Sequence, residues 1–230
     1  MSVDASAPAG PPASAPSPVP ALTERQEARR QRILRATQQL AARGGFDAVQ
    51  MREVAELSEV ALGTLYRYFP SKIHLLVATM QDQLEQLHDQ LRRKPPVSTD
   101  PGERVAETLM RTFKALQREP HLAEAMMRAL TFADRSVSAE VDSVNRLITD
   151  VIADAIHSGR PLTRAEFAAV RVVTHTWHST LITWLSGRAS ISQVKADIDT
   201  ACTLVSQATA TSAAGAAGAT AGAGSTADAE

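Results

Sequence analysis

Apolar residues recur along most of the chain at the three- and four-residue spacing of helices that are buried on one side. Long stripes of this kind run from Ile33 to Ala41, from Ile73 to Leu91 and from Phe167 to Leu185. No segment alternates apolar and polar residues as a strand does. The sequence therefore predicts an all-α fold of about nine helices. These helices are expected at about residues 23–43, 51–57, 61–69, 71–94, 101–119, 122–130, 141–155, 163–185 and 190–205.

Residues with known end preferences support these boundaries. Residues 23–26, 163–166 and 190–193 each begin with a hydroxyl side chain and end in Gln or Glu, which is the pattern of a capping box. Asp100 is placed to cap the next helix, because Pro101 follows it at the first helical position. Two successive glycines at positions 44 and 45 predict the end of the first helix.

The two ends of the chain have a different composition. Of the first 20 residues, 15 are Ala, Pro or Ser, and 22 of the 25 residues from 206 to 230 are Ala, Gly, Thr or Ser. Such segments lack the large apolar side chains whose burial offsets the entropy lost on ordering. We therefore expect disordered tails at residues 1–20 and 206–230.

Several classes of protein are disfavoured by what the sequence lacks. It has no run of 18 apolar residues and no secretory signal pattern, so we expect a cytoplasmic protein without a membrane partner. Its single cysteine, Cys202, excludes an intrachain disulfide framework and a zinc site built from thiolates. Charge is uneven, with six arginines against two glutamates in residues 23–43. This basic segment suits a polyanion partner, and a solvated helix face explains the charge equally well.

The pair of short helices at residues 51–57 and 61–69 has the form of a helix-turn-helix. The second helix divides into two sides at 100° per residue. The inner side carries Ala61, Leu65 and Tyr68. The outer side carries Gly63, Thr64, Tyr66 and Arg67. A small residue beside hydroxyl, phenol and guanidinium groups suits close approach to a DNA major groove, although an ordinary helical hairpin with a polar surface fits the same pattern.

The run from Gly63 to Lys72, GTLYRYFPSK, resembles the signature of TetR-family transcriptional repressors. Residues 51–55 and the Gly-Gly-Phe turn at 44–46 fit that signature as well. The resemblance implies a DNA-binding domain over residues 21–69 and a ligand-binding and dimerisation domain over residues 70–205. It further implies a homodimer that binds double-stranded, palindromic operator DNA and responds to a small-molecule effector.

The resemblance also assigns the residues that contact DNA. They are Arg52, Gly63, Thr64, Tyr66, Arg67, Tyr68 and Lys72. Thr64, Tyr66 and Arg52 are assigned to bases, whereas Tyr68 and Lys72 are assigned to phosphates. Leu65 and Phe69 are expected in the core. Leu62 is placed either to touch a thymine methyl group or to pack inward, and we favour packing.

Segments of the C-terminal domain resemble the KstR-type repressors of actinobacterial cholesterol catabolism, notably residues 122–126, 132–134, 139–142 and 188–190. That resemblance implies a steroid CoA thioester as effector, no other cofactor, and release of the operator when the effector binds. The apolar candidates for its pocket are Phe113, Met126, Met127, Leu130, Phe132, Val151, Trp177 and Leu181. Arg128 is the candidate for the thioester or the CoA phosphates. Each apolar candidate also fits an ordinary core.

Other functions remain open at this point. Control of other lipid, acyl-CoA or efflux genes fits the same family. A metal-dependent enzyme would use His175 and His178, which are three residues apart on one helix, but no Glu-x-x-His pair accompanies them. Cys202 has no local histidine partner, and there is no glycine-rich phosphate loop, so we expect no enzyme. A helical interaction module that does not bind DNA is the remaining alternative.

Overall fold

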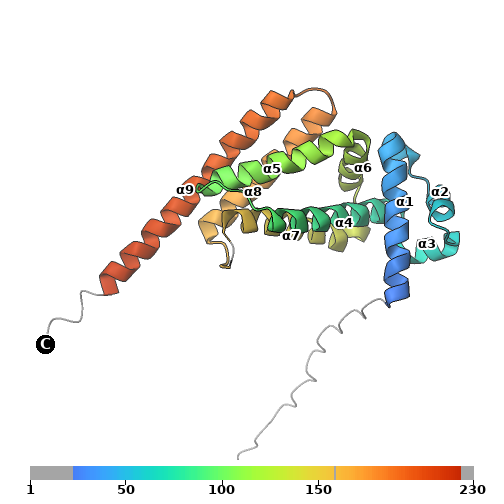
Figure 1. Ribbon diagram of the computed structural model, residues 1–230, viewed down its shortest axis with the longest axis horizontal. Helices are drawn as coiled ribbons and strands as arrows, with labels where there is room; N and C mark the ends of the chain where they lie inside the picture. The colour runs from blue at the N-terminus through green and yellow to red at the C-terminus, as the bar shows by residue number, and fades with distance from the viewer. Residues whose placement is uncertain (1–22, 158, 224–230) are drawn as a thin grey trace, which may run out of the picture.

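The computed structural model describes residues 23–157 and 159–223, and this part of the chain contains nine α-helices and no strand (Figure 1). The all-α prediction is confirmed. The helices are α1 (Glu24–Ala48), α2 (Met51–Leu57), α3 (Leu62–Tyr68), α4 (Lys72–Arg93), α5 (Pro101–Arg118), α6 (Pro120–Thr131), α7 (Ser138–Ile156), α8 (Arg164–Leu185) and α9 (Ile191–Ala223). A short 3-10 helix, η1 (Arg135–Val137), precedes α7 and was not expected from the sequence.

Helices α1, α2 and α3 form a head at one end of the molecule, and α4 to α9 form the body (Figure 1). Helix α4 starts at the head and runs into the body, where it lies beside α7. Helix α6 packs against α1, and α9 extends away from the body at the end opposite the head. No helix of the described residues is both long and apolar enough to cross a membrane.

The head and the body share one buried core. Ile33 of α1 and Leu65 of α3 belong to the same apolar cluster as Leu76 of α4 and Ala129 of α6. A second cluster joins α5, α7, α8 and α9. The division expected between residues 69 and 70 therefore does not correspond to a gap in packing, because the first core continues across it.

The helix caps form largely as the sequence predicts. Thr23 and Thr163 each complete both halves of a capping box. The Asp100 carboxylate accepts the Glu103 N–H at 2.8 Å, and the Ser190 hydroxyl accepts the Gln193 N–H at 3.1 Å. The first helix differs from expectation, because residues 44 and 45 leave the helical conformation and the helix then resumes to Ala48. The glycines therefore break α1 without ending it.

The prediction of a disordered C-terminal tail is wrong for residues 206–223, which continue α9. Alanine has the highest helix propensity, so an Ala-rich segment extends a helix that has already been nucleated. Its first turns are also anchored, because Ser206 donates to the Asp100 carboxylate at 2.7 Å and the Ser212 and Thr163 hydroxyls lie 2.8 Å apart. The expected tail at residues 1–20 and the final residues 224–230 lie outside the described residues.

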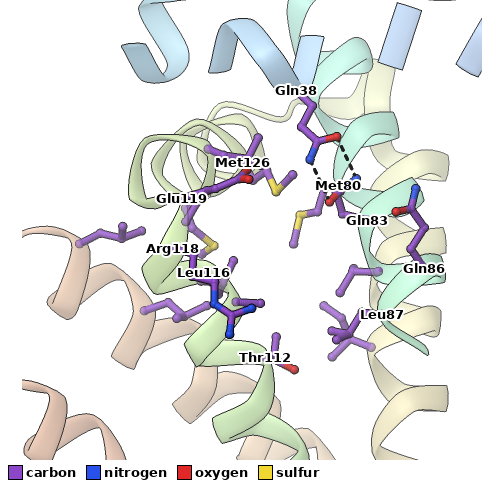
Figure 2. Close-up of a pocket in the computed structure, with 18 of the residues that line it drawn as sticks. Gln38, Met80, Gln83, Gln86, Leu87, Thr112, Leu116, Arg118, Glu119 and Met126 are labelled. Carbon is purple, nitrogen blue, oxygen red and sulfur yellow. Dashed lines mark hydrogen bonds between the residues drawn. The ribbon is translucent and has the colours of Figure 1, made fainter. Parts of the chain in front are cut away.

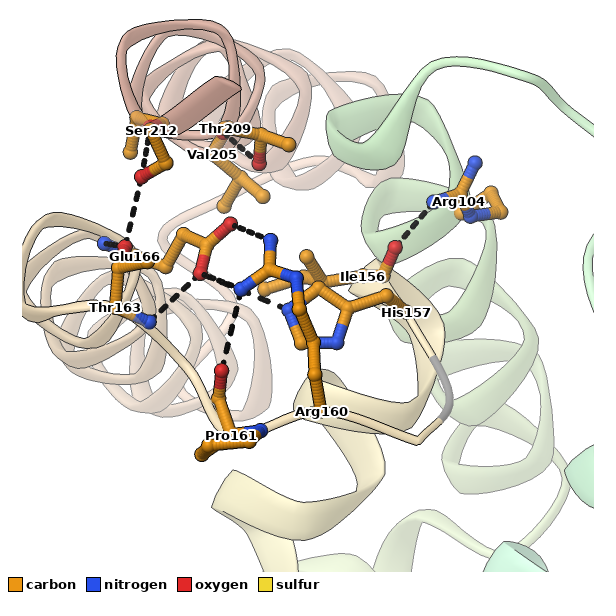
Figure 3. Close-up of polar contacts among 11 residues, drawn as sticks. Arg104, Ile156, His157, Arg160, Pro161, Thr163, Glu166, Val205, Thr209 and Ser212 are labelled. Atoms are coloured by element: carbon orange, nitrogen blue, oxygen red, sulfur yellow. Dashed lines mark hydrogen bonds and ion pairs between the residues drawn. The ribbon is translucent and has the colours of Figure 1, made fainter. Parts of the chain in front are cut away.

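A buried carboxylate fixes the connection between α7 and α8 (Figure 3). The Glu166 side chain is 0% exposed and accepts two hydrogen bonds from the Arg160 guanidinium, at 2.7 and 3.0 Å. It also accepts the Thr163 N–H at 2.8 Å. On the far side of the connection, Arg104 donates to the Ala155 carbonyl oxygen at 2.7 Å, which satisfies an acceptor at the end of α7. These bonds hold the entry of α8 against the body.

We expect Glu166→Gln to lower the free energy of unfolding by about 1–3 kcal/mol at pH 7, because charge-assisted hydrogen bonds to a buried group are lost. The Arg160 guanidinium lowers the pKa of the Glu166 carboxyl from 4.5 to about 2. A lowered pKa in the folded state stabilises the fold above pH 4.5, and that stabilisation is lost as the pH falls toward 2. Denaturant unfolding should therefore show a difference between wild type and variant that shrinks over this range. A difference that stays constant between pH 6 and pH 2.5 would contradict this role.

The Cys202 thiol should be unreactive in the native protein. It is only 2% exposed, and burial raises its pKa to about 12, so little thiolate is present at neutral pH. Labelling with a disulfide reagent at pH 8 should be slow in buffer and fast in denaturant. Rapid labelling of the folded protein would show that the packing of α9 on α5 is looser than described.

Candidate nucleic-acid interface and ligand cavity

Helix α3 is held in the head by its apolar side. Leu65 and Phe69 are buried as expected, and Leu62 is half-buried against the same core, so it packs inward. The preceding turn is tied back, because the Ser58 hydroxyl donates to the Val54 carbonyl oxygen at 2.6 Å. Arg32 of α1 donates to the Ser58 carbonyl oxygen at 3.5 Å. The orientation of α3 is thus fixed by both α1 and α2.

The turn between α2 and α3 contains a conformation that the sequence did not reveal. Glu59 has a φ of +55°, in the left-handed region that favours glycine. The Val60 N–H nevertheless closes the turn by donating to the Ala55 carbonyl oxygen at 3.0 Å. The turn therefore tolerates a residue with a side chain because hydrogen bonds and the core on both sides hold it.

The outer side of α3 is open to a partner. Gly63, Tyr66 and Arg67 are exposed, with Tyr66 at 46%, and Thr64 is half-buried beside them. Arg52 is exposed on α2. A Cβ atom added at Gly63 would meet nothing within 4 Å, so the protein's own packing does not require a glycine there. This arrangement leaves room for another macromolecule to approach the backbone of α3.

The two residues expected to bind phosphate also have partners within the protein. The Tyr68 hydroxyl donates to the Gln26 carbonyl oxygen at 3.4 Å. The Lys72 ammonium lies 4.0 Å from the centre of the Phe46 ring, where burial lowers its pKa and nearby Asp47 opposes that effect. Both groups are therefore positioned beside α3 before any partner binds.

A cavity of about 300 Å³ opens between α4, α5 and α6 (Figure 2). Its lining is mostly apolar and includes four of the nine residues predicted for the pocket. These are Met126, Met127, Trp177 and Leu181. A largely apolar cavity with a few polar groups is typical of a site for an apolar small molecule.

A second hollow of about 400 Å³ lies between α4, α6, α7 and α8 and is lined by the predicted residue Leu130. The two hollows share a wall made of Met80, Met127, Ile148, Trp177 and Leu181. Arg171, His175 and His178 line the second hollow. Burial lowers the pKa of His178, and nearby His175 adds to that effect, which favours the neutral imidazole. The second hollow thus combines the shared apolar wall with the Arg171 guanidinium and two imidazoles.

Four predicted pocket residues line neither hollow. Phe113 and Val151 are buried in the core, and Phe113 packs edge-on against Trp177 with ring centres 6.4 Å apart. Phe132 is 57% exposed, and its ring centre lies 5.9 Å from that of Phe46 in the head. Arg128 binds Asp47 and Glu124 at 3.0 and 3.2 Å. The apolar pattern of residues 120–132 does not show that Phe132 and Arg128 contact the head.

Polar residues at the first cavity were missed by the sequence reasoning. Gln38 of α1 and Gln83 of α4 pair through their side-chain amides, at 3.4 Å in both directions (Figure 2). Gln86 and Gln90 continue this polar edge along α4, and Arg118 lines the cavity from α5. On α4, the helical spacing of Gln83, Gln86 and Gln90 is visible in the sequence, but the same spacing is found on any solvated helix face.

The histidine pair does not gain further metal ligands. Within the described ranges, no group of three or more His, Cys, Asp or Glu residues is placed to hold a metal ion. His175 and His178 belong instead to the rim of the second hollow.

Comparison with known proteins covers both parts of the chain. Residues 33–79 match the model of the bacterial regulatory proteins of the tetR family, and residues 98–205 match the tetracyclin repressor-like C-terminal domain. The chain is 47% identical to the HTH-type transcriptional repressor KstR of Rhodococcus jostii, covering 74% of this chain and 78% of that one. It is 42% identical to KstR of Mycobacterium tuberculosis, covering 80% and 83%.

The fold agrees with a solved structure of the same class. The crystal structure of a TetR transcriptional regulator from Rhodococcus sp. RHA1 matches with a TM-score of 0.74 and 35% sequence identity. The match covers 79% of this chain and 97% of that one.

Proposed function

The chain belongs to the TetR family as a KstR-like transcriptional repressor, and we propose that it binds palindromic operator DNA as a homodimer and is released by a steroid CoA thioester. The observation that carries this proposal is the combination of an open polar face on α3 with an apolar cavity bounded by α6. Both features are carried by one core, which includes Leu65 of α3 and Met126 of α6.

The proposed base contacts are made by the exposed side of α3. Tyr66, Thr64 and Arg52 are presented toward the major groove, and the backbone at Gly63 allows close approach. Lys72 and Tyr68 flank this side and supply phosphate contacts. The KstR relatives are named as transcriptional repressors, which supports a DNA-binding role for this chain.

The proposed dimer uses α8 and α9. Large apolar side chains are exposed on both helices, at Phe167, Val172, Ile182, Ile191 and Leu204. Pairing them across a two-fold axis removes apolar surface from water and presents two copies of α3. The two copies must lie about 34–36 Å apart to enter successive major grooves of a palindrome.

The proposed effector places its sterol part against the shared wall of the two hollows. Met127 and Trp177 belong to that wall, and unbranched methionines adapt to an irregular apolar ligand. Arg118 in the first cavity and Arg171 in the second are available for the CoA phosphates, whereas Arg128 is engaged with the head. A ligand that prefers the conformation unable to fit DNA then shifts the population away from the operator.

Replacing Tyr66 should weaken DNA binding while the fold is kept. We expect Tyr66→Ala to raise the Kd for an operator duplex by roughly 5- to 150-fold, which corresponds to about 1–3 kcal/mol for a lost contact at a base edge. Arg93→Ala is the control, because Arg93 is exposed at the far end of α4. Fluorescence anisotropy with a duplex selected from a random pool measures both. Equal affinities for wild type and Tyr66→Ala would contradict the assigned reading face.

Filling the shared wall should block the effector without affecting the DNA contacts. We expect Ile148→Trp, on α7, to occupy part of both hollows, at a cost of about 1–3 kcal/mol in stability for overpacking. The variant should still bind the duplex, but a steroid CoA thioester should no longer release it. Free sterols and long-chain acyl-CoA thioesters serve as comparison ligands in the same gel-shift series. Release of the wild type by free sterol and not by the thioester would refute the proposed effector while the repressor function stands.

A further inference from the structure

Helix α6 presents different residues to the cavity and to the head. Leu122, Ala123, Met126 and Met127 line the first cavity. Glu124 and Arg128, which lie between and after them, bind residues of the head. Because an α-helix moves as a stiff body over two turns, displacement of one set displaces the other. The same short helix therefore touches both the ligand site and the DNA-binding part.

Glu124 binds the head at the break in α1. The glycines at 44 and 45 take the chain out of the helix, and the Phe46 N–H donates instead to the Glu124 carboxylate at 3.2 Å. Gly45 has a φ of +68°, and a Cβ atom there would lie only 2.6 Å from a Glu124 carboxylate oxygen. The glycine thus serves both the backbone conformation and the approach of Glu124. The break in α1 creates a donor that the body uses.

Arg128 adds a second connection one turn later. Its guanidinium bridges Asp47 of the head and Glu124 of its own helix, at 3.0 and 3.2 Å. The same group lies 4.6 Å from the centre of the Phe46 ring, within the range of a cation–π interaction. Lys72 lies 4.0 Å from that ring centre. Phe46 is therefore held by cations from α4 and from α6.

We propose that Glu124 and Arg128 are positioning residues that couple occupancy of the cavity to the orientation of the head. This inference rests on the proposed function, because it concerns how the effector reaches the DNA-binding surface. Glu124 and Arg128 line neither hollow and lie outside the reading face of α3, so their effect passes through Phe46, Asp47 and Lys72. Coupling between two sites is reciprocal, so DNA bound to the head must also affect the cavity.

Reciprocity gives a test that needs no effector. The only two tryptophans, Trp177 and Trp184, lie in the body, and Trp177 lines both hollows. A duplex selected from a random pool by the wild type is titrated into wild type, Glu124→Ala, Glu124→Gln and Arg128→Met. We expect tryptophan fluorescence to change when the wild type binds the duplex. In Glu124→Ala and Arg128→Met, that change should fall by at least half at saturating duplex, with the Kd within tenfold of wild type.

Control variants distinguish a loss of coupling from a general loss of structure. Glu107→Ala removes the acid of an i,i+4 pair with Arg111, which joins two residues of α5 and none of the head, and it should behave as wild type. Glu124→Gln keeps an acceptor for the Phe46 N–H and should restore part of the fluorescence change. Circular dichroism confirms that each protein is folded, and Arg128→Met keeps the aliphatic stem in case Glu124→Ala does not fold.

An experiment with the effector measures the coupling between the cavity and the head directly. A steroid CoA thioester should raise the Kd of the wild type for the duplex roughly 5- to 150-fold or more. In Glu124→Ala and Arg128→Met, the ratio of the Kd values with and without the thioester should fall toward one. A full fluorescence change in both variants, or none in a wild type that binds the duplex, would overturn the coupling and leave the repressor function intact. If the wild type selects no duplex, the proposed function fails and this inference falls with it.

Discussion

Burial of α1 against α6 is the contact on which the arrangement of the whole molecule depends. The head alone offers three helices, two of them only seven residues long, and its core is completed by Leu76 of α4 and by Ala125 and Ala129 of α6. Small alanines on α6 let the two helix backbones approach closely, which makes the packing sensitive to small shifts. The orientation of α3 is consequently a property of the body as much as of the head.

Local signals in the sequence were enough to predict the helices and the exposed side of α3. Prolines, glycines and hydroxyl caps act within a few residues, so Asp100 and Thr163 marked their helices correctly. The extension of α9 was missed because composition alone does not show that Ser206 and Ser212 have partners on other helices. A segment without large apolar residues can be ordered when a packed helix already leads into it.

The sequence predicts an apolar pocket, but it identifies only some of the residues that line it. Met126 and Met127 were recognised as adaptable apolar residues, and both line the cavity. Arg128 and Phe132 lie close to them in sequence, but their side chains contact the head. Helical periodicity does not show which part of the molecule each side of a helix contacts. Assigning those two residues required the position of Phe46, which is about 80 residues earlier in the chain.

The empty space around Gly63 has a consequence for how such proteins diversify. A side chain introduced there would meet no atom of the protein within 4 Å, and Gly63 does not adopt a positive φ, so neither sterics nor backbone strain opposes the change. The position lies on the exposed side of α3. Substitutions at residue 63 can therefore change the exposed surface of α3 without compensating mutations in the core.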